Sequence, residues 1–219
     1  MLSNNQQKLI IDKNNLITEK DVFNMVDNKF IANMSPIDWG KTMAIANEYI
    51  CKDLMTSLGG TKVIHTDECI EGSEGGMLLE RLNIDISNNG SGFDTIVLSN
   101  GKRIQCKIRQ VKGKTPYSRS VMFDNTRRPK GKNKGDEGET GHVRYSIGEF
   151  DYVLVSLIES YKDKSVRTDL NKWNFSFVPI SDLVDPNMPG FCSKTIPASV
   201  LEKNKLESDK DWADRFKDV

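Results

Sequence analysis

The sequence predicts an α/β protein with a mixed β-sheet flanked by helices. Three observations support this fold class. Helix start signals and helical spacing occupy the first 60 residues, an Asn-Gly hairpin signal lies near the middle, and two apolar strand-like runs follow it. At 219 residues, one domain with a sizeable core is the default expectation.

Two helices are expected in the first 60 residues. Residues 18–21 resemble a capping box and precede apolar residues at near-helical spacing. Ser35 and Pro36 are a stronger start signal, with a cap residue followed by proline in the first turn. This second helix should run to Leu58 and stop at Gly59-Gly60. Much of its buried stripe is marked by Ile45, Ile50, Leu54 and Leu58.

The next segments alternate between short elements and turns. Residues 61–65 can form a short strand, and Ser73 can cap a short helix that ends near Leu82. Residues 88–92 contain Asn, Gly and Ser and are typical of a turn.

Two runs rich in β-branched residues, 93–98 and 103–109, flank Asn100-Gly101 and predict a hairpin. With a two-residue loop, Ile96 faces Gln105 and Asp94 faces Lys107 across the strands. Side chains alternate between the faces of a sheet, so the acid, the amide and the lysine share one face. The other face then carries Ile104, Cys106 and Ile108.

Residues 112–141 are rich in Gly, Pro, Lys and Arg and predict a loop. The apolar run 150–158 is typical of a strand buried on both faces, and 173–180 predicts another strand. Ser208 can cap a last short helix that carries Trp212 and Phe216.

The net charge is zero, but basic residues concentrate in and after the hairpin. Such a block is expected of a surface that contacts the phosphates of DNA, and the alternative is a solvated basic loop. The basic block begins in the hairpin with Lys102, Arg103 and Lys107. The candidate DNA-binding side chains are Arg109, Lys112, Lys114, Arg119, Arg127, Arg128, Lys130, Lys132 and Lys134.

The spacing from Asp94 to Gln105-Cys106-Lys107 resembles the core motif of the PD-(D/E)XK nuclease superfamily, which includes most type II restriction endonucleases. The family pattern is an Asp on one strand and Glu/Asp-x-Lys on the next. This chain has Phe93 where the family has proline, and Gln105 where it has the second acid. A natural glutamine variant and an inactivating substitution would both produce this pattern.

The resemblance implies a restriction-endonuclease-like core that binds Mg²⁺. Asp94 would be the principal metal ligand, with the Cys106 backbone carbonyl and the Gln105 amide oxygen beside it. Lys107 would orient the attacking water and offset the charge of the phosphate. Glu80, on the short helix before the hairpin, is either the acid that replaces the missing carboxylate or a solvated surface residue, and Asp85 is a weaker alternative.

The implied function is a type II restriction-like endonuclease that cuts double-stranded DNA as a homodimer. A structure-selective repair or recombination nuclease and a catalytically inactive, sequence-specific DNA-binding protein are the alternatives. The endonuclease domain would span residues 1–219, with N-terminal helices in 1–60, the catalytic core in about 61–184 and a C-terminal extension in 185–219.

Other function classes find little support in the sequence. There is no phosphate-binding Gly-x-x-x-x-Gly-Lys-Ser/Thr motif, so no nucleotide cofactor is expected. Without an apolar run of membrane length or a signal peptide, we expect a cytoplasmic, bacterial protein with no membrane partner. Four scattered cysteines predict reduced thiols. His65 and Cys69 have a spacing possible for zinc ligands, but no second pair accompanies them, which favours ordinary packing.

Overall fold

The computed structural model describes residues 36–84, 92–111, 115–123, 144–159, 163, 166, 169–217 and 219. The helix predicted from Thr18 and the turn at 88–91 lie outside this part of the chain. None of the helices within it is both long and apolar enough to cross a lipid bilayer.

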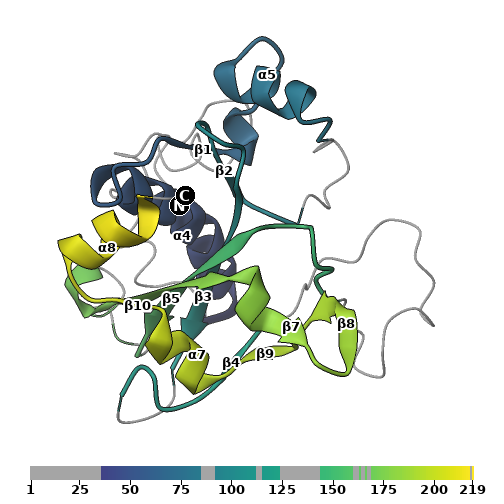
Figure 1. Cartoon of the computed structure of the whole chain (residues 1–219). Helices are drawn as coiled ribbons and strands as arrows, with labels where there is room; N and C mark the ends of the chain where they lie inside the picture. The colour runs from purple at the N-terminus through teal and green to yellow at the C-terminus, as the bar shows by residue number, and fades with distance from the viewer. Residues whose placement is uncertain are drawn as a thin grey trace.

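A six-stranded mixed sheet forms the centre of the fold, as the sequence predicts (Figure 1). Strands β3 and β5 are parallel, and all other neighbours in the sheet are antiparallel. In spatial order the strands are β1 (Val63–His65), β2 (Thr95–Val97), β3 (Arg103–Gln110), β5 (Tyr152–Ile158), β6 (Asn174–Pro179) and β10 (Lys205–Leu206).

Helices cover the sheet, and most of the predicted ones are confirmed. These are α4 (Pro36–Ser57), α5 (Glu74–Arg81) with its Ser73 cap, and α8 (Asp209–Phe216) with its Ser208 capping box. A further helix, α7 (Ala198–Lys203), was not predicted because no cap side chain marks its start.

Smaller elements complete the described fold. Strand β4 (Val121–Met122) pairs with β9 (Thr195–Ile196), so the prediction of loop throughout 112–141 is wrong at these two residues. Strand β7 (Val184–Asp185) pairs with β8 (Met188–Cys192). Three 3-10 turns are η1 (Thr66–Glu68), η3 (Leu170–Lys172) and η4 (Ile180–Leu183).

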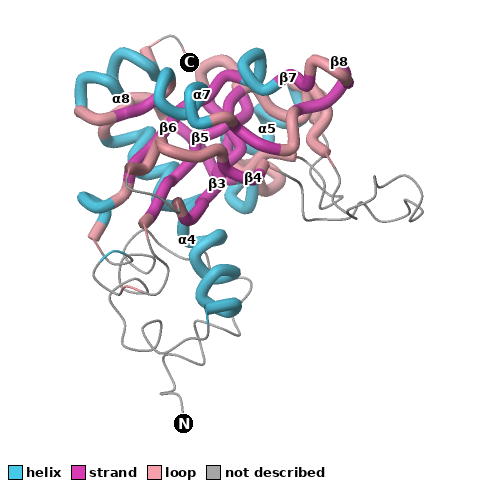
Figure 2. The backbone as a smooth tube through the Cα atoms, turned by 90° about the horizontal axis from the view of Figure 1, so that it is seen from below, coloured by secondary structure: helices cyan, strands magenta, loops and turns pink. Residues whose placement is uncertain are grey.

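The sheet separates two hydrophobic cores. Helices α4 and α8 pack over one face, where Ile104, Cys106 and Ile108 of β3 point as predicted. The other face is covered by α5, α7 and the segment around Tyr145, and Figure 2 shows α4 and α7 on different sides of the strands. Because β5 lies between the two cores, it is apolar along nearly its whole length.

The buried stripe of α4 differs in one position from the prediction. Ile45 is 52% exposed, whereas Ile50 is buried and Leu54 and Leu58 pack at the edge of the core. The stripe is rotated away from Ile45 because the helix face that meets the sheet is the one carrying Met43, Ala46, Asn47, Ile50, Cys51 and Met55. The face of α4 that packs against the sheet therefore carries one polar residue, Asn47, among apolar ones.

The hairpin forms, but its predicted register is wrong by two residues. Thr95 lies opposite Ile104 and Ile96 opposite Arg103. The backbone N–H of Leu98 donates to the carbonyl of Lys62 at 3.1 Å, so the chain turns toward β1 before it reaches Asn100. Gly101, with φ of +72°, closes a longer loop instead. A shift of two residues keeps every side chain on its predicted face.

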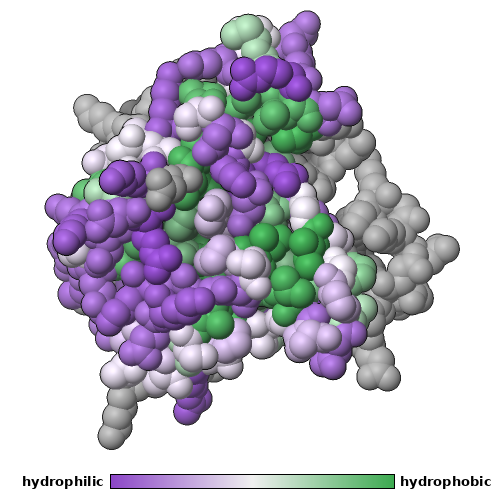
Figure 3. Space-filling model, in the orientation of Figure 1, coloured by the Kyte–Doolittle hydropathy of each residue, from purple (hydrophilic) through white to green (hydrophobic). Residues whose placement is uncertain are grey.

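Most of the exposed large apolar side chains of the described residues fall into two groups (Figure 3). One group lies at and near α5 and the other around β7 and β8. Their members are Ile70, Met77 and Leu82, and Ile147, Val184, Met188 and Phe191.

Candidate active site

Asp94 lies immediately before β2, with its carboxylate against β3. Its Oδ2 accepts the backbone N–H of Cys106 at 2.8 Å and also accepts from Nε2 of Gln105. Its own backbone N–H donates to the carbonyl of Ile104 at 3.0 Å, and its carbonyl accepts from Thr66 at 2.9 Å. These contacts hold a buried carboxylate against an interior strand of the sheet.

The structure brings together three of the groups expected at the site, namely the Asp94 carboxylate, the Gln105 amide and the Cys106 carbonyl. Nε2 of Gln105 donates to Asp94 and lies 3.3 Å from the Cys106 carbonyl oxygen. In the structure the amide nitrogen faces these two acceptors, and the offer of the Gln105 oxygen to a cation stays a prediction. The amide donates to both of the oxygen groups expected to bind a cation.

Lys107 follows two residues later on β3 and is half-buried. Because of the shifted register it is not the direct cross-strand partner of Asp94, although its charge acts on that carboxylate. Its Nζ lies 5.1 Å from the centroid of the Tyr145 ring, a distance suited to a cation–π contact. The ring and the strand together restrict where the ammonium can lie.

Glu48 on α4 is a second acid whose charge acts on Asp94. Burial and the nearby charge of Glu48 raise the pKa of Asp94 to about 7, while Lys107 and the N–H of Cys106 act in the opposite direction. The side chain of Glu48 is only 14% exposed, and its Oε2 lies 3.1 Å from Nε2 of His65. A partly buried acid on a helix that packs against β1 and β3 is thus placed to act on the hairpin.

Glu80 has a different environment. It is exposed near the end of α5, and it is not one of the groups that shift the pKa of Asp94. The weaker candidate Asp85 lies outside the described residues. Glu48 was not recognised from the sequence, although an acid next to buried residues of a predicted helix is a signal that could have identified it.

Two of the predicted DNA-binding residues, Arg109 and Arg119, lie in the part of the chain that the structure describes. Arg119 is exposed, as a phosphate contact requires. Arg109 donates from Nε to the carbonyl of Met122 at 2.8 Å and from a terminal nitrogen to that of Ile108 at 3.0 Å, which ties it to β4. Outside the described residues lie Lys112, Lys114, Arg127, Arg128, Lys130, Lys132 and Lys134.

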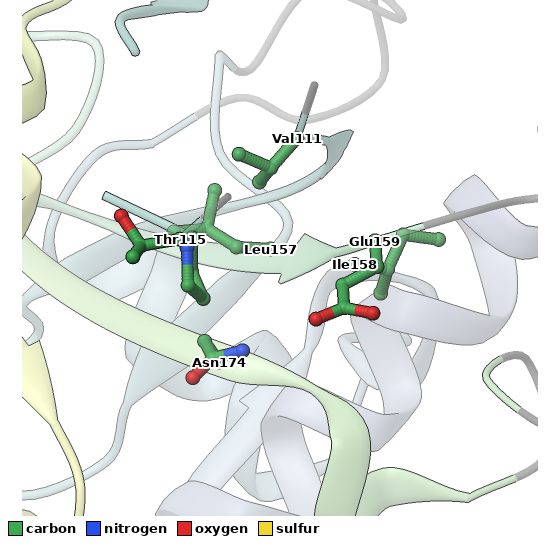
Figure 4. A pocket seen from close by; sticks show the side chains of 7 residues that line it. Val111, Thr115, Leu157, Ile158, Glu159 and Asn174 are labelled. Carbon is green, nitrogen blue, oxygen red and sulfur yellow. The ribbon is translucent and has the colours of Figure 1, made fainter. Parts of the chain in front are cut away.

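A small pocket lies at the end of β5, away from Asp94 (Figure 4). Val111, Leu157 and Asn174 are among its lining residues, and about 10 Å³ of it is accessible to the centre of a water molecule. This is room for about one water, so the pocket is too small for a substrate group.

The donor set near Asp94 suits a hard cation such as Mg²⁺. The Asp94 carboxylate and the Cys106 carbonyl are oxygen groups of the kind that Mg²⁺ prefers, whereas the Gln105 amide presents its nitrogen to both. Burial and the charge of Glu48 raise the pKa of Asp94, and a cation beside it would favour its ionised form. No group of three or more His, Cys, Asp or Glu side chains is arranged to hold a metal within the described ranges. A cation held by few protein ligands and several waters is the mode typical of Mg²⁺.

No protein-family model, curated protein or solved structure matches this chain.

The raised pKa of Asp94 leads to a prediction about stability and pH. The folded state keeps a proton that the unfolded chain loses, so stability falls as pH rises from the ordinary value of 3.8 to about 7. Asp94→Asn should therefore stabilise the cation-free protein at pH 8, with a gain that fades toward pH 4. Denaturant unfolding across this range measures the effect.

Asp185→Asn is a control of opposite sign. Asp185 accepts from the backbone N–H of Asn187 at 2.9 Å and from Arg144, and these contacts lower its pKa. Its contribution is present at neutral pH and lost in acid, so this variant should be less stable at pH 8. Equal effects of pH on both variants would contradict the assignment for Asp94.

The position of the Gln105 amide leads to a second prediction. In Gln105→Glu, a carboxylate replaces the amide nitrogen that donates to the Asp94 carboxylate and the Cys106 carbonyl. Three negatively polarised groups then face one another, so the cation-free variant should have a lower melting temperature at pH 8. Mg²⁺ or Ca²⁺ should raise that temperature more in the variant than in the parent protein. Differential scanning calorimetry with and without each cation provides the measurement.

Gln110→Glu is the matched control, since Gln110 lies at the end of the same strand and its Nε2 donates to the Glu159 carbonyl at 3.2 Å. It should show no added response to cation. A similar response in both variants would remove the Gln105 amide from the cation site.

Proposed function

We propose that this chain is a Mg²⁺-dependent endonuclease of the PD-(D/E)XK superfamily that cuts double-stranded DNA at a specific sequence. The observation that carries the proposal is the gathering of the Asp94 carboxylate, the Gln105 side chain, the Cys106 carbonyl and the Lys107 ammonium at one hairpin. A second acid, Glu48, acts on the same carboxylate from the neighbouring helix.

The arrangement of the sheet supports the proposal. The hairpin β2–β3 is followed by a strand parallel to β3, and helices pack on both faces. This is compatible with the restriction-endonuclease-like core that the motif implies. Since β3 is interior to the sheet, the groups it carries are held by strands on both sides.

The Mg²⁺ site would be formed by Asp94, the Cys106 carbonyl, Gln105 and Glu48. Bound there, Mg²⁺ would supply charge neutralisation on the phosphate and a more acidic water. A half-turn of the Gln105 amide exchanges its nitrogen and oxygen, which would present the oxygen to the cation without moving the strand. Glu48 would provide the negative charge that Gln105 lacks.

Lys107 is the residue that would contact the reacting phosphate. Its ammonium can donate to a phosphoryl oxygen or orient the attacking water, and both interactions favour the extra negative charge of the transition state.

Recognition of DNA by a homodimer is part of the same proposal. A two-fold dimer matches the symmetry of a palindromic duplex, and the basic block between the hairpin and residue 134 supplies charge for phosphate contacts. Restriction of foreign DNA in the bacterial cytoplasm is the corresponding role.

One observation favours a second candidate function. The Gln105 amide satisfies both oxygen groups without a cation, as expected of a sequence-specific DNA-binding protein whose site has lost catalysis. Incubation of plasmid DNA with increasing Mg²⁺ separates the possibilities. Discrete fragments support the endonuclease, nicking only at branched or damaged DNA indicates a repair nuclease, and tight binding without cuts indicates an inactive site.

Lys107→Ala should lower cleavage by about a hundred- to a thousandfold while the melting temperature changes little, because the lost charge stabilises the transition state. Lys107→Arg should not restore the rate, because a planar guanidinium cannot replace a compact ammonium. Cleavage of plasmid DNA under single-turnover conditions measures both variants.

Lys102→Ala removes a lysine from the same hairpin and serves as the control. Its Nζ lies 3.6 Å from the Asp151 carboxylate, outside the proposed site. If Lys107→Ala cleaves DNA as fast as Lys102→Ala does, Lys107 has no part in the reaction.

Glu48→Gln and Glu80→Gln test which acid serves the site. Glu48→Gln should raise the Mg²⁺ concentration needed for half-maximal cleavage by about tenfold or more, because a carboxylate that supports the cation is lost. Glu80→Gln should leave this concentration unchanged, since Glu80 is exposed on α5. A larger increase in this Mg²⁺ concentration for Glu80→Gln than for Glu48→Gln would identify Glu80 as the second acid.

A further inference from the structure

His65 is a buried histidine whose polar atoms all have specific neighbours. It is 2% exposed, and its ring stacks on Tyr49 of α4 with centroids 4.4 Å apart and planes 19° from parallel. Its backbone N–H donates to Oε2 of Glu68 at 3.0 Å, and its Nδ1 accepts the backbone N–H of Asp67 at 3.2 Å. The ring is therefore held in one orientation by both its face and its edge.

These contacts determine which ring nitrogen carries the proton. Nδ1 accepts a hydrogen bond from a backbone N–H, so its lone pair must face Asp67. In a neutral imidazole the other nitrogen, Nε2, then carries the proton. Since Nε2 lies 3.1 Å from Oε2 of Glu48, it donates to that carboxylate.

The same tautomer argues against His65 as a metal ligand. Ligation through Nε2 would move the proton to Nδ1, where it would face the N–H of Asp67 at 3.2 Å, while the Asp67 carboxylate oxygen, 3.7 Å from Nδ1, is too far to accept it. Two donors would then meet at one position. His65 is consequently suited to hold a carboxylate and poorly suited to bind a cation directly.

The location of His65 connects Glu48 to Asp94. His65 is opposite Thr95 in the β1–β2 pair, and the next residue, Thr66, donates its backbone N–H to the Asp94 carbonyl at 2.9 Å. The segment formed by His65 and Thr66 is thus hydrogen-bonded through Thr66 to the backbone of Asp94 and through His65 to the side chain of Glu48. A glutamate has three side-chain torsions, so without such an anchor it would sample several positions.

We propose that His65 is a positioning residue that presents Glu48 to the cation site at Asp94. The inference rests on the proposed nuclease function and adds to it a residue that sets cation affinity without contacting the cation. Oε2 of Glu48 is occupied by His65, while Oε1 has no hydrogen-bond partner in the described part of the chain. The anchor therefore leaves one carboxylate oxygen available for the cation or one of its waters.

Calorimetric titration with Ca²⁺, which needs no DNA cleavage, measures this role. His65→Phe keeps an aromatic ring against Tyr49 but removes the donor, and should weaken Ca²⁺ binding by about tenfold or more, the usual effect of losing such an outer contact. His65→Gln keeps an N–H donor at the position of Nε2 and should restore most of the affinity. In a Glu48→Ala background, His65→Phe should have no further effect.

Val63→Ala is the control for packing, because Val63 is a buried residue two positions earlier on β1. It should lower the melting temperature and leave Ca²⁺ affinity unchanged. An equal loss of affinity in Val63→Ala, or the same loss from His65→Phe with and without Glu48, would overturn the positioning role.

NMR of the imidazole nitrogens tests the hydrogen bond independently of any cation. The expected tautomer of the parent protein has the proton on Nε2, and a proton on Nδ1 in a chain that binds Ca²⁺ would overturn the positioning role alone. Absence of Ca²⁺ binding and of DNA cleavage in the parent protein would overturn the proposed function, together with the purpose assigned to His65.

Discussion

The hydrogen bond from the Cys106 backbone N–H to Asp94 Oδ2 is the contact on which the candidate site depends. It attaches a carboxylate to the side of β3 with a distance of 2.8 Å, at the point where β2 begins. Because the donor is a backbone group, its position is set by the ladders on both sides of β3 and not by a flexible side chain. The carbonyl of Cys106 and the side chains of Gln105 and Lys107 are then held at fixed distances from that carboxylate by the strand itself.

This arrangement has a free-energy cost, because the charge of Asp94 is buried. Burial and the charge of Glu48 disfavour the ionised carboxylate and raise its pKa to about 7. In the absence of a cation, the Gln105 amide and the Lys107 ammonium offset part of the cost. A cation that binds beside such a carboxylate stabilises its charge and lowers the free energy of the folded protein. Carboxylates with strongly shifted pKa values are for this reason candidates for functional sites.

Helix α4 connects this chemistry to the hydrophobic core. Ile50 and Met55 pack against the sheet, while Tyr49 stacks on His65 and Glu48 reaches its Nε2. The apolar residues fix the position of the helix along β1 and β3, and that position decides where the Glu48 carboxylate lies. Packing and electrostatics are therefore not separate here, because a change in the core beneath α4 would also move the acid that acts on Asp94.

Local patterns in the sequence determined the elements and the face of β3 on which each side chain lies. Caps at Ser73 and Ser208, the apolar run of β5 and the alternation around Gln105 are each read within a few residues, and these predictions are confirmed. Only the tertiary structure decided the register of the hairpin. The backbone N–H of Leu98 donates to the carbonyl of Lys62, which directly precedes the neighbouring strand β1. The tertiary structure likewise decided that Glu48, and not Glu80, lies near Asp94. The charge of Glu48 acts on Asp94 because α4 packs across the sheet, and no pattern along the chain records which of two helices will do so.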